Sequence, residues 1–132
     1  MFLYNLSIYF FGFAIRIAAF FNSKAKLWIK GRKNIFEKLK STIDSPSKII
    51  WFHVASLGEF EQGRPVIEGI RKTHLGYKIL LTFFSPSGYL HYHKRQHKAD
   101  YVCYLPLDTP SNTRKFIQHF KVLVIYESIP IY

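Results

Sequence analysis

The chain has 132 residues, enough for one domain with a modest hydrophobic core. Its 19 lysines and arginines outnumber 8 acidic residues, so the formal net charge is +11 and an anionic partner is favoured. A single cysteine, Cys103, excludes an intramolecular disulfide and so excludes a disulfide-stabilised secreted scaffold.

Residues 1–22 are predicted to form a membrane anchor helix. The run from Met1 to Phe21 is apolar and aromatic, with Arg16 as its only charge. About 20 such residues are needed for a helix to cross a bilayer. The run lacks the basic start and small-residue cleavage site of a signal peptide. An uncleaved anchor or a helix lying in the membrane surface is therefore favoured over a buried core helix.

Residues 23–48 are predicted to form a basic amphipathic helix, over Trp28–Lys40, and a linker that turns at 44–47. The first 48 residues carry nine basic and two acidic side chains, a net charge of +7. Such a block suits anionic lipid, nucleic acid or a phosphorylated substrate, and a solvated linker helix is the alternative. Because basic residues stay on the cytoplasmic side, we expect the cytoplasmic face of a membrane.

Residues 49–132 alternate apolar runs with helical patterns. Strands are predicted near 49–53, 78–84, 101–105 and 122–126, and helices at 60–72, 89–98 and 111–120. Strands that are apolar throughout and separated by helices indicate a parallel sheet covered on both faces. The predicted fold class is therefore α/β, with a Rossmann-like parallel sheet preceded by the N-terminal helix.

The turn after the first predicted strand is the strongest candidate site. Ser56, Gly58 and Glu59 lie between the apolar run 49–52 and an amphipathic helix. This turn points backbone N–H groups and an acid into the crevice at the carboxyl end of a sheet. Glu59 is a candidate base, or else a partner of the helix dipole. Glu61 is the rival carboxylate, and Ser56 suits a helix cap or a substrate contact.

The turn after the second strand is predicted to line the same cleft. Ser85, Ser87 and Gly88 are candidate substrate contacts, with helix capping as the alternative. His91, His93 and His97 are interpreted as surface residues, because no acidic or cysteine ligand stands near them in sequence. We therefore predict no metal and no cofactor.

Three motifs, in this order and spacing, give the chain a specific resemblance. They are Trp-Phe-His-Val-Ala-Ser-Leu-Gly-Glu at 51–59, Thr-Phe-Phe-Ser-Pro-Ser-Gly-Tyr at 82–89 and Tyr-Leu-Pro-Leu-Asp-Thr-Pro at 104–110. The chain resembles the N-terminal domain of the 3-deoxy-D-manno-octulosonate (Kdo) transferases of lipopolysaccharide synthesis. After Phe120 it departs from that pattern: the last strand is short and an expected tryptophan is missing.

The resemblance implies the N-terminal, acceptor half of a GT-B glycosyltransferase at the cytoplasmic face of the inner membrane. Such enzymes transfer Kdo from CMP-Kdo to a lipid A precursor (lipid IVA) and need no metal. Glu59 matches the family's general base, and Glu127 its second cleft glutamate. The domain that binds most of the CMP-Kdo has no counterpart in this chain.

Two other interpretations of the chain stand beside this one. It could be an inactive membrane-surface binding module, or a remnant lacking the donor domain. A nucleic-acid partner is the weakest interpretation, because the basic block adjoins an apolar segment and no base-reading motif is present. We therefore expect an anionic membrane and no nucleic acid as partner.

Overall fold

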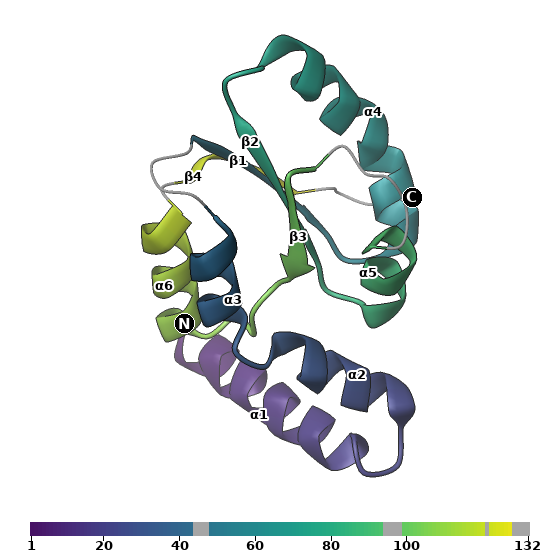
Figure 1. Ribbon diagram of the computed structural model, residues 1–132. Helices are drawn as coiled ribbons and strands as arrows, with labels where there is room; N and C mark the ends of the chain where they lie inside the picture. The colour runs from purple at the N-terminus through teal and green to yellow at the C-terminus, as the bar shows by residue number, and fades with distance from the viewer. Residues whose placement is uncertain (44–47, 94–98, 121, 128–132) are drawn as a thin grey trace.

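The computed structural model describes residues 1–43, 48–93, 99–120 and 122–127, with the backbone alone at 119, 120 and 122–127. Helices flank a central sheet, and two further helices lie at one end of it (Figure 1). In chain order the elements are α1 (Phe2–Ala18), α2 (Ser23–Arg32), α3 (Ile35–Thr42), β1 (Ile49–Val54), α4 (Leu57–Thr73), β2 (Lys78–Phe83), α5 (Pro86–His93), β3 (Tyr101–Tyr104), α6 (Pro110–Phe120) and β4 (Val122–Glu127).

The four strands form one parallel sheet in the order β3-β2-β1-β4. The central strands β1 and β2 pair in register, with Ile50 opposite Ile79. Both are buried on the two faces, which is why their sequences are apolar throughout instead of alternating. The predicted α/β class and its parallel sheet are confirmed.

Each face of the sheet has its own hydrophobic core. On one face α4 and α5 bury Phe60, Ile67 and Tyr92 against alternate residues of β1 and β2. On the other face α3 and α6 bury Leu39 and Phe116 against the sheet. The helices α4 and α5, which connect β1 to β2 and β2 to β3, therefore cover one face, and α6, which connects β3 to β4, covers the other. The switch between the two faces falls between the neighbouring strands β1 and β4. Crevices at the carboxyl end of such a switch point are the usual ligand sites of α/β proteins.

The single helix predicted over Trp28–Lys40 is wrong. The structure ends α2 at Arg32 and begins α3 at Ile35, with Asn34 between them at φ 56°. Asparagine adopts this left-handed conformation more readily than most residues, so it permits a sharp turn. Because of the turn, Trp28 packs at the end of the sheet while Leu39 packs on its face.

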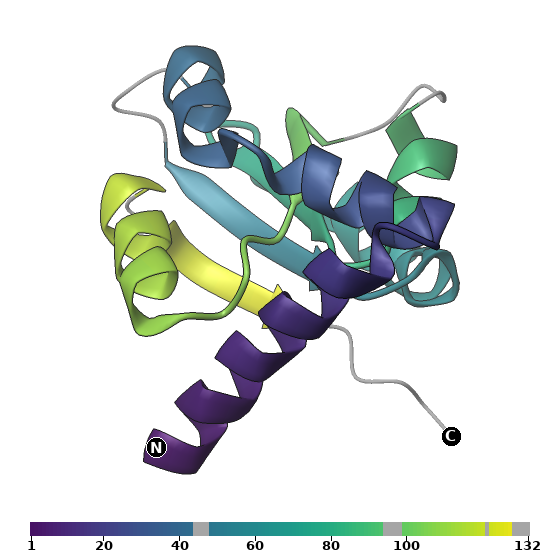
Figure 2. The same cartoon turned by 90° about the horizontal axis from the view of Figure 1, so that it is seen from below.

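Helices α1 and α2 form a hairpin across the carboxyl ends of the strands (Figure 2). Within the described residues, no helix is both long enough and apolar enough to span a bilayer. Instead α1 contacts the domain: Gly12 is buried against Leu107, and the Tyr4 hydroxyl donates to Asp108 at 2.5 Å. That hydrogen bond holds the pKa of Asp108 below its usual value.

The outer face of α1 and the turn that follows it are exposed and aromatic. Phe2, Phe10, Phe13, Phe20 and Phe21 are each more than half exposed. Contiguous apolar surface of this kind is typical of a contact with another protein or a membrane. The membrane-anchor role of residues 1–22 stays a prediction.

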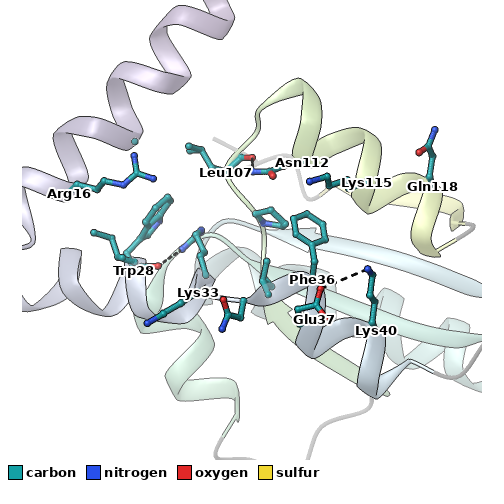
Figure 3. Close-up of a pocket in the computed structure, with 16 residues that line it drawn as sticks. Arg16, Trp28, Lys33, Phe36, Glu37, Lys40, Leu107, Asn112, Lys115 and Gln118 are labelled. Carbon is teal, nitrogen blue, oxygen red and sulfur yellow. Dashed lines mark hydrogen bonds and ion pairs between the residues drawn. The ribbon is translucent and has the colours of Figure 1, made fainter.

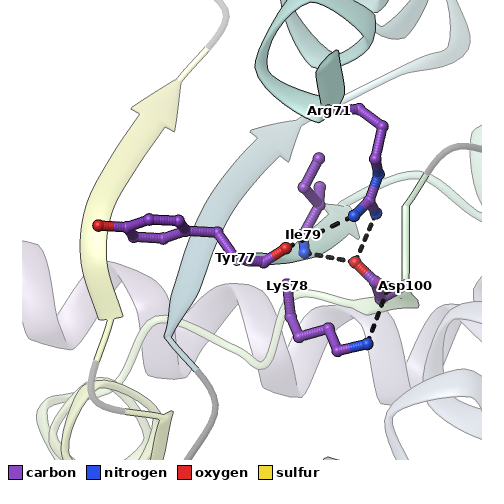
Figure 4. Close-up of polar contacts among 5 residues, drawn as sticks. All are labelled: Arg71, Tyr77, Lys78, Ile79 and Asp100. Carbon is purple, nitrogen blue, oxygen red and sulfur yellow. Dashed lines mark hydrogen bonds and ion pairs between the residues drawn. The ribbon is translucent and has the colours of Figure 1, made fainter. Parts of the chain in front are cut away.

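A charged cluster around Asp100 fixes the amino end of the sheet (Figure 4). Asp100 accepts hydrogen bonds from the Ile79 N–H at 2.7 Å and from the Arg71 guanidinium at 2.5 Å, and Lys78 lies 3.6 Å away. Burial alone would raise the pKa of Asp100, but these hydrogen bonds and charges outweigh it and lower that pKa. Because the cluster lies at the opposite end from the candidate site, its role is structural.

Candidate functional site

The turn after β1 places Glu59 in the first turn of α4, at the carboxyl end of the sheet. Ser56 has extended backbone and caps the helix: its Oγ accepts a hydrogen bond from the Glu59 N–H at 3.4 Å. The Glu59 carboxylate in turn accepts from the Ala55 N–H at 2.6 Å. This reciprocal arrangement resembles a capping box, a common device for satisfying the free N–H groups at a helix start.

Gly58 is the exposed residue of this turn. A Cβ built there would come no closer than 3.9 Å to another heavy atom, the Ser56 Oγ. No contact among the described residues therefore requires glycine at this position. The open space over Gly58 leaves room for a ligand to approach the backbone beside Glu59.

The turn after β2 lies beside the turn after β1. The Ser85 N–H donates to the Ala55 carbonyl at 2.9 Å, and the hydroxyls of Ser85 and Ser87 are 2.8 Å apart. Gly88 is buried, and a Cβ there would lie 2.8 Å from the Phe83 ring and 3.1 Å from the Leu57 nitrogen. Gly88 therefore has a packing role, and substrate contact by Ser85, Ser87 or Gly88 stays a prediction.

Glu127 ends β4, the strand next to β1. Its backbone pairs in register with His53, one residue before the end of β1. Glu59 follows the carboxyl end of the central strand β1, and Glu127 ends the neighbouring edge strand β4. Both candidate glutamates therefore come from the carboxyl end of the sheet. The orientation of the Glu127 side chain lies outside what the structure describes.

His53 was given no role by the sequence motifs. Its Nδ1 lies 3.0 Å from the buried Thr82 hydroxyl, which also accepts a hydrogen bond from the Trp51 indole at 2.8 Å. His53 and Trp51 line a small cavity of about 180 Å³ between β1 and α6, together with residues of the loop 105–108. Thr82 thus orients a histidine toward space beside the candidate site.

A second, larger pocket of about 910 Å³ lies between α1, α2, α3, α6 and the loop before α6 (Figure 3). Its aromatic and apolar wall includes Trp28, Phe36 and Leu107. Basic side chains come to it from four helices, and Glu37 is the only acidic side chain among the described residues that line it. We call this the cationic pocket, and its basic residues are Arg16, Arg32, Lys33, Lys40 and Lys115.

Arg32 connects the cationic pocket to the carboxyl ends of β2 and β3. Its guanidinium donates to the carbonyls of Leu105 at 2.8 Å and Phe84 at 2.9 Å. It also lies 3.6 Å from the centroid of the Trp28 ring. Burial lowers the pKa of Arg32 to about 9, so the guanidinium still carries its charge at neutral pH. Arg32 therefore joins the α1–α2 hairpin to the two loops that border the candidate site.

Two other candidates for chemistry find no support in the described residues. Burial raises the pKa of the Cys103 thiol to about 12, so this cysteine is not a thiolate nucleophile at neutral pH. No three His, Cys, Asp or Glu side chains in the described ranges lie together as metal ligands would. His97, one of the three histidines considered from the sequence, lies outside those ranges.

The sequence motifs missed the cationic pocket. Arg16, Arg32 and Lys115 are separated by up to 99 positions, from 16 to 115, and no local pattern links them. The excess of basic residues in the first 48 positions indicated an anionic partner, but not that α6 would complete the site. Only the packing of α1 across the carboxyl end of the sheet brings these side chains together.

Comparison with known proteins agrees with the motifs in the two turns. A sequence model described as 3-deoxy-D-manno-octulosonic-acid transferase (kdotransferase) matches residues 29–128. The 3-deoxy-D-manno-octulosonic acid transferase of Aquifex aeolicus is 30% identical over 90 residues, which are 67% of this chain and 25% of that protein. A probable mitochondrial 3-deoxy-D-manno-octulosonic acid transferase of Arabidopsis thaliana is likewise 30% identical over 90 residues, 67% of this chain and 20% of its own length. The chain thus spans a quarter or less of these relatives, and it belongs to the 3-deoxy-D-manno-octulosonic-acid transferase family.

Proposed function

We propose that this chain forms the N-terminal, acceptor-side part of a GT-B glycosyltransferase. The complete enzyme would transfer Kdo from CMP-Kdo to a lipid A precursor in lipopolysaccharide synthesis. Membership of the family supports the reaction class. Because the chain spans a quarter of its Aquifex aeolicus relative, donor binding is assigned mainly to a separate C-terminal domain.

Glu59 is proposed as the general base. An inverting transfer needs a carboxylate that takes the proton of the acceptor hydroxyl as its oxygen attacks the anomeric carbon. Glu59 lies in the first turn of α4, at the strand–turn–helix junction where the motif 51–59 ends, beside the open backbone of Gly58. This placement is the observation that carries the proposal. Glu127 is proposed as a second glutamate of the same cleft, since its strand pairs with β1.

A binding module without catalysis is the alternative function. The observation that favours it is the hydrogen bond of the Glu59 carboxylate to the Ala55 N–H, which gives Glu59 a structural use that needs no substrate. The two roles are compatible, because a carboxylate can hold one backbone N–H and still accept a proton through its remaining lone pairs. Transfer activity therefore has to decide between them.

The proposed location is the cytoplasmic face of the inner membrane. Its support is the group of exposed phenylalanines on α1 and in the turn after it, next to a strongly basic α2–α3 segment. Aromatic side chains suit the membrane interface, and lysines and arginines suit anionic headgroups.

Transfer of labelled Kdo from CMP-Kdo to lipid IVA tests the proposal. The enzyme is a chimera in which this chain replaces the matching N-terminal part of the Aquifex aeolicus transferase. We expect the chimera to transfer Kdo and the isolated chain to bind lipid IVA without transfer. A chimera that folds, keeps its donor binding and transfers no Kdo would contradict the transferase role and favour the binding module.

A further inference from the structure

The small cavity between β1 and α6 differs in charge from the cationic pocket, with which it shares Pro106, Leu107 and Asn112 as lining residues. Asp108 is the one carboxylate among the described residues that line the small cavity, and no lysine or arginine is among them. The whole chain, with its net charge of +11, attracts anions. This cavity instead favours a ligand that is neutral or positively charged.

Two aromatic side chains form one wall of the small cavity. The rings of Trp51 and Phe116 have centroids 4.8 Å apart, and Phe116 is buried. The Trp51 indole N–H donates to the buried Thr82 hydroxyl at 2.8 Å, which fixes the orientation of the Trp51 ring. An aromatic surface that is already held in place loses little freedom when a flat apolar face packs on it.

Two polar side chains of the cavity retain capacity to accept hydrogen bonds. Asp108 receives the Tyr4 hydroxyl on one carboxylate oxygen and the Thr113 hydroxyl on the other. A carboxylate has about four acceptor positions, so about two of them remain. The Asn112 side-chain NH₂ donates to the Leu107 carbonyl at 2.9 Å, and its amide oxygen accepts no hydrogen bond from a described residue. Asp108 and Asn112 can therefore both accept from hydroxyls of a ligand.

The size and the lining of the cavity indicate a sugar ring. Its volume of about 180 Å³ is below the roughly 300 Å³ at which sites for drug-sized molecules begin, so it holds one ring and not a nucleotide. A pyranose ring carries C–H groups on its faces and hydroxyls around its edge. Its face suits the Trp51 ring, and its hydroxyls suit the acceptors of Asp108 and Asn112. An anionic group on the ring would be repelled by Asp108.

The cavity borders the turn after β1. His53 lines it and lies two residues before Ala55, whose N–H binds the Glu59 carboxylate. A ring in the cavity would therefore lie near the proposed general base.

We propose that the small cavity binds a neutral sugar ring, which packs on Trp51 and donates hydrogen bonds to Asp108 and Asn112. The proposal deepens the proposed function, and it rests on that function for one assignment only, that the ring belongs to the acceptor. Binding of a sugar can be measured without Kdo transfer, so the two proposals can fail separately.

The test compares three methyl glycosides of different charge: neutral methyl glucoside, cationic methyl glucosaminide and anionic methyl glucuronide. The full chain carries Trp28→Phe, so that Trp51 is its only tryptophan and its fluorescence reports on the cavity. The assay is made at mildly acidic pH, where the amine is protonated. Asp108 is still ionised there, because hydrogen bonds from Tyr4 and Thr113 lower its pKa.

The expected order of affinity follows the charge of Asp108. Methyl glucoside should bind with a dissociation constant of about 1 mM, as expected for so small a ligand. Methyl glucosaminide should bind at least as tightly, and methyl glucuronide about tenfold more weakly. Tightest binding of the glucuronide would overturn the proposal, because the net charge of the chain would then explain binding. The absence of saturable binding of methyl glucoside would overturn it as well.

Asp108→Asn tests the cavity directly. It removes the charge and should bring the affinities for the three glycosides within about threefold of one another. The matched control is Asp100→Asn, the same substitution at the amino end of the sheet, which should keep the parent order. Thermal unfolding establishes that each variant is folded at the assay temperature. Equal changes in the two variants would overturn the proposal.

Kdo transfer in the chimera separates the cavity from the proposed function. Asp108→Asn should raise the KM for lipid IVA by about fivefold or more and leave kcat unchanged, which is the mark of lost substrate binding. An unchanged KM would overturn the assignment of the ring to the acceptor. If the parent chimera transfers no Kdo while the order of the glycosides holds, the proposed function fails and the sugar site is retained.

Discussion

The turn at 55–59 and the cationic pocket differ in how far the chain satisfies its own polar groups. In the turn, consecutive residues form an internal arrangement in which Ser56 caps the helix and Glu59 binds the Ala55 N–H. In the pocket, side chains from four helices bring together positive charges, and no carboxylate in the described residues pairs with Arg16 or Lys115. The turn satisfies these polar groups without a ligand, whereas the pocket has positive charge that an anion would neutralise.

This difference decides which measurements are informative. Because Glu59 also stabilises the start of α4, a change in stability alone does not reveal its role in catalysis. Lys115 makes no such contact in the described residues, so binding is the direct measure of its role. Single substitutions can therefore separate the turn from the pocket and from the scaffold that carries both.

Arg32→Met should produce the largest loss of stability, because Arg32 joins the pocket to the loops beside the turn. It removes the donor for the Leu105 and Phe84 carbonyls and the charge over the Trp28 ring. We expect a loss of about 3 kcal/mol in the free energy of unfolding, measured by urea denaturation. Lys33→Met, at the next and exposed position, should change it by less than about 0.5 kcal/mol. Equal effects would show that the hairpin is not held by Arg32.

Gly31→Ala should weaken the docking of α2. A Cβ at Gly31 would lie 2.1 Å from the ring of Tyr104, which is 4% exposed and therefore cannot move away easily. We expect a loss of about 2 kcal/mol in unfolding free energy despite the better helix propensity of alanine.

Gly12→Ala is the matched substitution on α1. Its Cβ would meet only the end of the Leu107 side chain, at 2.8 Å, and that side chain can rotate. We expect a loss of less than about 1 kcal/mol. A larger loss for Gly12→Ala than for Gly31→Ala would mean that α1, and not α2, anchors the hairpin to the sheet.

Asp100→Asn tests the scaffold at the end of the sheet far from both sites. Because the folded state lowers the pKa of Asp100, the stabilisation is present above the unfolded value of about 3.9 and is lost as the pH falls through the folded pKa. At neutral pH the variant should lose about 1.5 kcal/mol of unfolding free energy. The difference in unfolding free energy between parent and variant should narrow as the pH falls from the unfolded pKa through the lower folded pKa of Asp100. A gap that stays constant with pH would contradict the role of the Asp100 charge.

Gly58→Ala should have the smallest effect on stability and separates folding from acceptor binding in the turn. The space for a Cβ is open, so the unfolding free energy should stay the same or rise by less than about 1 kcal/mol. If a substrate approaches the backbone at Gly58, binding of lipid IVA should weaken in the same variant. Unchanged lipid binding would remove Gly58 from the site.

The sequence was sufficient where local patterns carry the structure. The apolar runs at 49–53 and 78–84 predicted two buried strands, which the structure has at Ile49–Val54 and Lys78–Phe83. Ser56 to Glu59 predicted the turn between strand and helix. It failed at Lys33 and Asn34, where a left-handed residue breaks a pattern that otherwise continues as helix. The pocket was also missed, because the placement of α1 and α6 around one space is set by long-range packing and not by periodicity.

The general-base role of Glu59 is tested most directly by Kdo transfer in the chimera with the Aquifex aeolicus transferase. Glu59→Gln keeps the size of the side chain and a hydrogen-bond acceptor for the Ala55 N–H, while Glu61→Gln removes a carboxylate from the exposed face of the same helix turn. The account predicts a loss of about 100-fold or more in transfer rate for Glu59→Gln and less than about twofold for Glu61→Gln. A Glu59→Gln chimera that transfers Kdo at the parent rate would contradict it and leave Glu59 with its capping role alone.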